Sequence, residues 1–190
     1  MSLDFYRRPV EMTALGRHAT AFDGLPRDPA ELAAIVQGVM IHEHMGEMYG
    51  VAFTCQQHGE AHLRALGGTL DRIAAHDPKH PLAARPPGQR TVGVCRHFTL
   101  LHVAMLRAQG VAARARCGFG GHFEKGKYYD HWVTEYWNEA QRRWILVDPQ
   151  IDERQREVFG ITIDLMDVPR DQFLVAGDAW QLCRAGKSDP

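Results

Sequence analysis

The sequence predicts an α+β protein, and two patterns support this prediction. Apolar residues recur at helical spacing in segments before residue 110, whereas apolar and polar residues alternate from residue 111 onward, as they do in strands. The chain has 190 residues, 45% of them apolar, which is enough for one compact domain with a sizeable core and rather short for two. We therefore expect a single domain over residues 1–190.

The helical segments come first. Residues 29–48 follow an aspartate and begin with a proline, which is a typical helix start, and residues 60–75 are broken into two short helices by a pair of glycines. Residues 77–89 contain four prolines and predict a loop. The next helix begins close to Cys95 and ends before Gly110, and its apolar positions predict burial on most sides.

The strands follow. Residues 111–117 alternate like a strand with one wet face, and the glycine-rich residues 118–127 predict a loop. Residues 131–137 and 142–148 predict a hairpin joined by a four-residue turn. Beyond it, we expect a helical turn over 152–158, a short strand over 161–165 and a last helix over 171–183.

Charge excludes some partners. Lysine plus arginine number 22 and aspartate plus glutamate 23, a net charge of -1, which gives no pull toward nucleic acid or an anionic membrane. The balance is uneven along the chain, because residues 77–117 hold seven basic residues and one acidic residue. Residues 148–190 hold nine acidic and five basic residues. We therefore expect basic surroundings for a cysteine within 77–117.

The four cysteines predict free thiols, since no two of them form a CxxC pair. Residues 1–16 mix charged and apolar residues and do not resemble a secretory leader, and no segment approaches the ~20 apolar residues of a membrane span. Together these observations predict a cytoplasmic protein.

The hairpin brings two chemically useful residues together. If the turn is centred between Glu139 and Ala140, His131 stands directly opposite Asp148, within hydrogen-bond reach. A histidine oriented by an aspartate acts as a general base when a nucleophile lies on its other side. Cys95 is the natural candidate, because the positive end of a helix dipole favours the thiolate.

Each of these residues also has a purely structural interpretation. A lone cysteine at a helix start is more often a small buried residue, and a strand histidine is more often a packing residue. A metal-binding protein is a further alternative, because an H-x-H pair and an i, i+4 histidine pair could supply ligands. These histidines are His42, His44, His58 and His62.

Four segments, taken in order, resemble the transglutaminase-like superfamily of cysteine enzymes. They are residues 93–98 (GVCRHF), 106–114 (LRAQGVAAR), 130–133 (DHWV) and 144–149 (WILVDP). The resemblance implies a papain-like α+β arrangement in which a nucleophile helix packs on an antiparallel sheet. By this resemblance Cys95 is the nucleophile, His131 the base and Asp148 the residue that orients the base.

The same resemblance leaves the oxyanion site open. Many family members use a tryptophan upstream of the cysteine, but all four tryptophans here follow Cys95. Gln89 has the spacing of the glutamine donor of papain-like proteases, and Gln56 and Gln57 are further candidates.

The resulting hypothesis is a cysteine-dependent acyl-transfer enzyme. It would be a hydrolase of amide or peptide bonds or a transglutaminase, and it would need no cofactor and no metal. The expected partner is a peptide, protein or small amide substrate, with no nucleic acid and no membrane, and the oligomeric state stays open. Candidates for the substrate groove are Arg96, Tyr129 and Trp132. The alternatives are a catalytically silent binding module on the same fold and the histidine-based metal protein.

Overall fold

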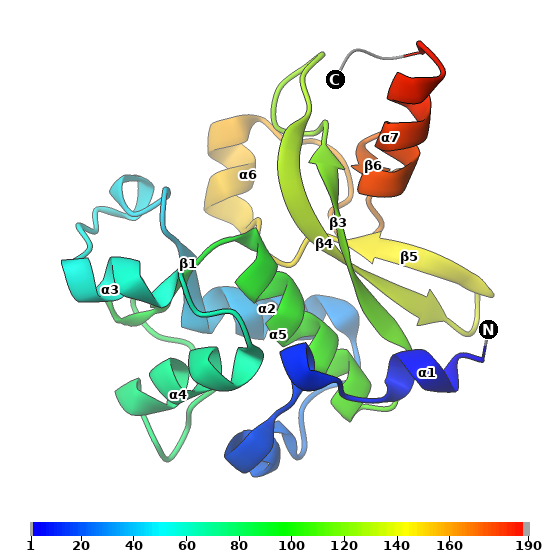
Figure 1. The fold of residues 1–190 in the computed structure, drawn as a ribbon. Helices are drawn as coiled ribbons and strands as arrows, with labels where there is room; N and C mark the ends of the chain where they lie inside the picture. Colours follow the sequence, from blue (N-terminus) through cyan, green and yellow to red (C-terminus); the bar gives the residue numbers. More distant parts are fainter. Residues whose placement is uncertain (1, 188–190) are drawn as a thin grey trace.

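A computed structural model describes residues 2–187 (Figure 1). Residues 1 and 188–190 of the predicted domain lie outside this range. Its helices are α1 (Asp4–Arg7), α2 (Pro29–Val39), α3 (Cys55–Glu60), α4 (Leu66–His76), α5 (Cys95–Ala108), α6 (Glu153–Phe159) and α7 (Ala176–Arg184). Its strands are β1 (Met40–His42), β2 (Thr91–Gly93), β3 (Ala113–Gly120), β4 (Tyr129–Asn138), β5 (Arg143–Val147) and β6 (Phe173–Val175). Within the described range no helix is both long and apolar enough to cross a membrane.

Helix α5 packs on an antiparallel sheet of strand order β5-β4-β3-β6, which confirms the predicted α+β arrangement (Figure 1). His102 on α5 links the two layers, because one ring nitrogen lies 3.1 Å from the Thr134 hydroxyl on β4 and the other 2.9 Å from the Pro29 carbonyl. Burial lowers the pKa of His102 to about 4. This histidine is therefore a neutral packing residue in the core.

Two apolar cores flank the sheet. The first joins α2, α4 and α5 to the start of β3, with Leu101 and Met105 of α5 fully buried in it. The second is built on Val133 of β4 and Leu146 of β5, and it is closed by residues of the segment after β5 and by Phe173. The cysteine helix belongs to the first core, and the strands that carry the other two candidate residues contribute to the second.

A second, smaller sheet was not predicted from the sequence. Strands β1 and β2 pair in parallel, with Met40 opposite Thr91 and His42 opposite Gly93. Because β1 follows α2 directly, the helix predicted over 29–48 ends at Val39. A parallel pair between segments about 50 residues apart leaves no local sequence pattern, which is why it was missed.

Strand β3 runs three residues further than predicted, through Gly118–Gly120, and there it pairs with β6. A Cβ on Gly118 would lie 2.1 Å from the Leu174 carbonyl oxygen, so glycine at this position lets β6 approach. The predicted strand over 161–165 is wrong, since this segment is irregular, and the last helix begins at Ala176 rather than at residue 171.

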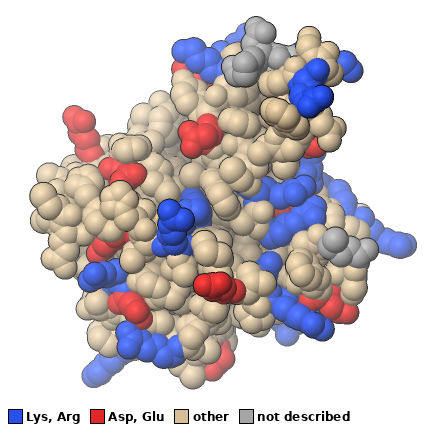
Figure 2. All heavy atoms as spheres, viewed as in Figure 1, with Lys and Arg blue, Asp and Glu red and all other residues tan. Residues whose placement is uncertain are grey.

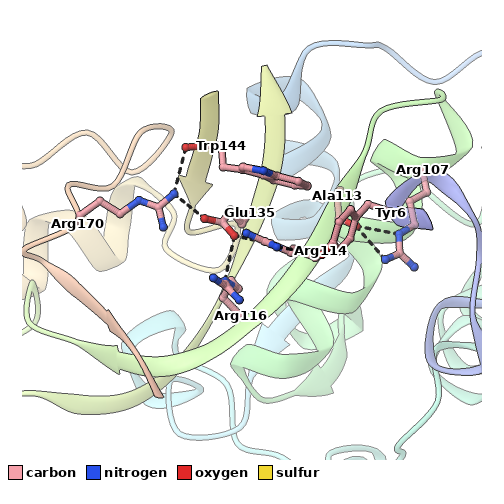
Figure 3. Close-up of polar contacts among 8 residues, drawn as sticks. All are labelled: Tyr6, Arg107, Ala113, Arg114, Arg116, Glu135, Trp144 and Arg170. Atoms are coloured by element: carbon pink, nitrogen blue, oxygen red, sulfur yellow. Dashed lines mark hydrogen bonds and ion pairs between the residues drawn. The ribbon is translucent and has the colours of Figure 1, made fainter. Parts of the chain in front are cut away.

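Two basic residues of the segment 77–117 bind a carboxylate on the sheet (Figure 3). Arg114 and Arg116 of β3 lie 2.6 and 2.9 Å from the buried Glu135 carboxylate of β4, and Arg170 joins them at 2.5 Å. The Arg114 guanidinium also stacks 4.2 Å above the Trp144 ring. On the face drawn in Figure 2, Lys and Arg gather over β5 and its neighbouring strands. Two of the seven basic residues of the predicted segment, Arg114 and Arg116, are therefore held in a structural ion network of the sheet.

Candidate active site

The nucleophile candidate lies at the first residue of α5. Val94 is the extended residue before the helix, and its N–H donates to Nδ1 of His97 (3.1 Å). The other ring nitrogen of His97 donates to the Leu63 carbonyl (2.7 Å). These two bonds fix the helix start at Cys95, which is half-buried, and they make His97 a capping residue. The first N–H groups of the helix have no intrahelical partner and lie beside the thiol.

His131 and Asp148 form a buried pair. Nε2 of His131 donates to Oδ2 of Asp148 over 2.8 Å, and both side chains are almost fully buried. Nδ1 is the ring nitrogen left for another partner, and Cys95 is among the groups that interact with His131. The structure thus brings the three predicted residues together in the order thiol, imidazole, carboxylate.

The β4–β5 register that brings His131 and Asp148 together differs from the predicted register by two residues. Glu135 stands opposite Leu146 and Trp137 opposite Trp144, because the turn occupies residues 139–142 and includes Arg142 at a φ of 52°. Asp148 therefore lies beyond the end of β5, diagonal to His131 rather than directly opposite it. The two side chains still meet, since a shift of two residues keeps each on its own face of the sheet.

A second histidine holds the same carboxylate, and the sequence did not predict it. Nε2 of His122 donates to Oδ2 of Asp148 over 3.2 Å, and the backbone N–H of Gln150 donates to Oδ1 over 3.1 Å. His122 lies in the loop after β3, directly after Gly120 and Gly121. A Cβ on Gly120 would lie 3.2 Å from its ring, so this glycine leaves room for the ring. The two glycines were the one local signal that could have marked the position.

The buried charges shift the two titrations in opposite directions. Burial by itself lowers the pKa of His131, but the charge and hydrogen bond of Asp148 and the contact with Cys95 outweigh it and raise this pKa to about 10. Burial raises the pKa of Asp148, yet the two histidines outweigh that effect and hold it well below its usual range. The arrangement therefore favours a histidine cation beside a carboxylate anion over a wide pH range.

A pocket of about 680 Å³ opens onto Cys95 and His131. Of the predicted groove residues, Arg96, Tyr129 and Trp132 all line it, although the Arg96 guanidinium donates to the Leu63 and Arg64 carbonyls. The remaining lining residues are His42, Glu43, His44, Met45, Val94, Phe123, Glu124, Asp130, Gln150 and Phe159.

The expectation of basic surroundings is not met in this pocket. Its charged lining residues are Arg96 and three carboxylates, those of Glu43, Glu124 and Asp130. The other arginines of the segment are bound elsewhere, as Arg107 is to the Ala113 carbonyl. A count along the chain could not reveal this, because side-chain direction decides which charges reach the site.

Gln89 does not reach the pocket. It ends a short 3-10 turn (Pro87–Gln89), its side chain is exposed, and it is not among the residues that line the pocket. Gln57 does not line the pocket either, and its side chain caps α3 at Thr54. None of the three predicted oxyanion candidates, Gln89, Gln56 and Gln57, is therefore among the lining residues.

The four histidines of the metal alternative are not brought together. His42 and His44 line the pocket, whereas His58 packs its ring on Phe53 and His62 lines a separate depression. Among residues 2–187, the one set of three metal-ligating side chains with ligand atoms within 4.8 Å of one another is His122, His131 and Asp148. Hydrogen bonds within this set already explain why its ligand atoms lie close together.

The fold and the site together define a class: an α+β protein in which a cysteine at a helix start adjoins a buried histidine–aspartate pair. Residues 74–149 match the family described as the transglutaminase-like superfamily. This match covers less than half of the chain, and it agrees with the resemblance that the motifs predict.

Other comparisons add little. No curated protein matches the sequence. Among solved structures, a "Putative Cysteine Protease" from Cytophaga hutchinsonii is similar, with 17% sequence identity and a TM-score of 0.45. The match covers 93% of this chain and 48% of that one, so the chain spans about half the length of this relative.

Proposed function

We propose that the protein is a cysteine-dependent enzyme that acts on amide or related acyl bonds. The observation that supports this most strongly is the position of His131, which is hydrogen-bonded to Asp148 through Nε2 and in contact with Cys95, at the wall of an open pocket. A thiol beside an imidazole that a carboxylate orients is the arrangement needed for nucleophilic acyl transfer.

The reaction runs in two halves. The Cys95 sulfur attacks the substrate carbonyl, a C–S bond forms, and the C–N bond breaks as His131 gives its proton to the leaving amine. Water then attacks the thioester, His131 takes a proton from that water, and the C–S bond breaks to release the acid and to restore the Cys95 thiolate beside protonated His131. An amine in place of the water would give transamidation by the same steps. We favour hydrolysis as the main activity.

Iodoacetamide labelling tests the proposal, because the chain contains its own reference thiols. Cys55 and Cys117 are exposed, whereas Cys95 is half-buried. With site-resolved mass spectrometry at pH 6, we expect Cys95 to react at least tenfold faster than Cys55, since a thiol beside an imidazole is activated as a nucleophile.

Two variants complete the test. His131→Ala should reduce the labelling rate of Cys95 to that of Cys55 or below, and Cys95→Ala should abolish acyl-enzyme formation with activated esters. A Cys95 that labels no faster than Cys55 in the unmodified protein would reject the enzyme and favour a silent binding module on the same fold.

A further inference from the structure

One polar atom at the pocket has no partner within the described range. His42 lies at the end of β1, half-buried, and it lines the pocket together with Cys95 and His131. Its Nδ1 accepts a hydrogen bond from the backbone N–H of His44 (3.3 Å). Its Nε2 has no hydrogen-bond partner among residues 2–187 and is not among their fully buried, unsatisfied atoms. This nitrogen therefore reaches solvent at the pocket.

The contact with His44 fixes the tautomer. An acceptor nitrogen carries no proton, so the neutral ring of His42 carries its hydrogen on Nε2. Burial, followed by the charges of His44, His131 and His97, lowers the pKa of His42 to about 4. Above that pH the neutral ring of His42 can donate through Nε2–H, which lies on the other side of the ring from the Nδ1 contact with the His44 backbone.

Backbone pairing places this donor beside the nucleophile. His42 stands opposite Gly93, two residues before Cys95, and the Glu43 N–H donates to the Gly93 carbonyl over 2.9 Å. A Cβ on Gly93 would lie 2.8 Å from the Met40 side chain, so glycine allows the two strands to pack closely. The position of His42 relative to Cys95 is therefore set by the main chain.

We propose that His42 Nε2–H and the backbone N–H of Cys95 together form the oxyanion site of this enzyme, an inference that rests on the proposed function. When the Cys95 sulfur bonds to the substrate carbon, the carbonyl π electrons move to oxygen, and the two N–H groups bind the resulting negative charge. When the carbonyl re-forms, the leaving group departs and both donors are released unchanged. His42 thus takes the place that the sequence suggested for Gln89.

Two chemical probes separate an oxyanion-binding role of His42 from a role in supporting the thiol–imidazole pair. Acylation by p-nitrophenyl acetate passes through an oxyanion, whereas alkylation by iodoacetamide displaces iodide and forms none. For His42→Ala we expect the acylation rate of Cys95 to fall by about 10²–10³-fold and its alkylation rate to stay within about threefold of the unmodified protein. His42→Gln retains a side-chain N–H donor and should recover at least tenfold of the loss. His58→Ala, which removes an exposed imidazole outside the pocket, is the matched control.

The outcomes are distinct. An acylation rate in His42→Ala within about threefold of the unmodified protein would overturn the inference, and so would an equal loss of both reactions, which would mark His42 as a support of the thiol–imidazole pair. If Cys95 of the unmodified protein is unreactive toward both probes, the proposed function itself fails, and this inference fails with it.

Discussion

Replacing Asp148 by asparagine should remove most of what holds His131 in its charged form. The carboxylate is fully buried, and it accepts hydrogen bonds from His131, His122 and the backbone of Gln150. Asparagine keeps the size of the side chain and one oxygen acceptor but carries no charge. The change therefore isolates the electrostatic part of the interaction, and burial is left to lower the pKa of His131.

The magnitude follows from the titration of His131. Its pKa lies at about 10 rather than at the ordinary 6.5, and each tenfold change in proton affinity corresponds to about 1.4 kcal/mol. The Cys95 contact supplies part of this shift. We therefore expect Asp148→Asn to lower the free energy of unfolding by about 3–5 kcal/mol near pH 6, in line with the loss of one partner of a buried ion pair.

The sign of the pH dependence is also fixed. Because His131 is more basic in the folded protein than in the unfolded chain, its contribution is complete below pH 6.5 and is lost as the pH rises through about 10. The contribution of Asp148, whose pKa is lowered by folding, is present above pH 3.8 and is lost as the pH falls through the folded value. The pair thus stabilises the protein most between about pH 4 and 6.5.

Urea unfolding followed by tryptophan fluorescence at pH 6 and pH 9.5 measures both effects. The unmodified protein should lose stability between these two values more steeply than Asp148→Asn does. Asp130→Asn is the matched control, because Asp130 is an exposed neighbour of His131, and it should shift stability by no more than about 0.5 kcal/mol. An Asp148→Asn variant within 1 kcal/mol of the unmodified protein, with the same pH slope, would refute the reasoning.

Two further predictions concern the sheet. Glu135→Gln leaves Arg114, Arg116 and Arg170 without their shared carboxylate, and urea unfolding should show a loss of about 2–4 kcal/mol; a change below 0.5 kcal/mol would mean that the network is neutral. Gly118→Ala places a Cβ against the Leu174 carbonyl, so hydrogen exchange at residues 173–175 should accelerate and stability should fall by about 1–3 kcal/mol. Gly177→Ala has open space around its Cβ and is the control for Gly118→Ala; equal exchange in both variants would contradict the clash.

Local sequence patterns were sufficient to predict which elements carry Cys95, His131 and Asp148. A helix start predicts the position of Cys95, and two alternating segments predict the strands of His131 and Asp148. The register was wrong by two residues, yet the expected contact forms, because side chains in a strand repeat every two residues. A prediction that two side chains lie on the same face of a sheet therefore holds when the register is wrong by two residues. A prediction that they stand directly opposite each other does not.

What the sequence could not supply depends on contacts between distant segments. His122 reaches Asp148 from a loop, and His42 reaches the pocket through a parallel pairing with residues 91–93. Neither has a periodic signal, and His42 was interpreted as a candidate metal ligand. The count of basic residues in 77–117 gave a wrong prediction of the charge around Cys95 for a related reason, since Arg114 and Arg116 bind Glu135 and do not line the pocket.

The division of the molecule into two cores has a mechanical consequence. Cys95 and His42 are joined by the β1–β2 pairing beside the helical core, whereas Val133 and Leu146, on the strands next to His131 and Asp148, pack in the other core. A mutation that displaces the two cores relative to each other would therefore lengthen the sulfur–imidazole contact and leave the geometry between donor and nucleophile unchanged.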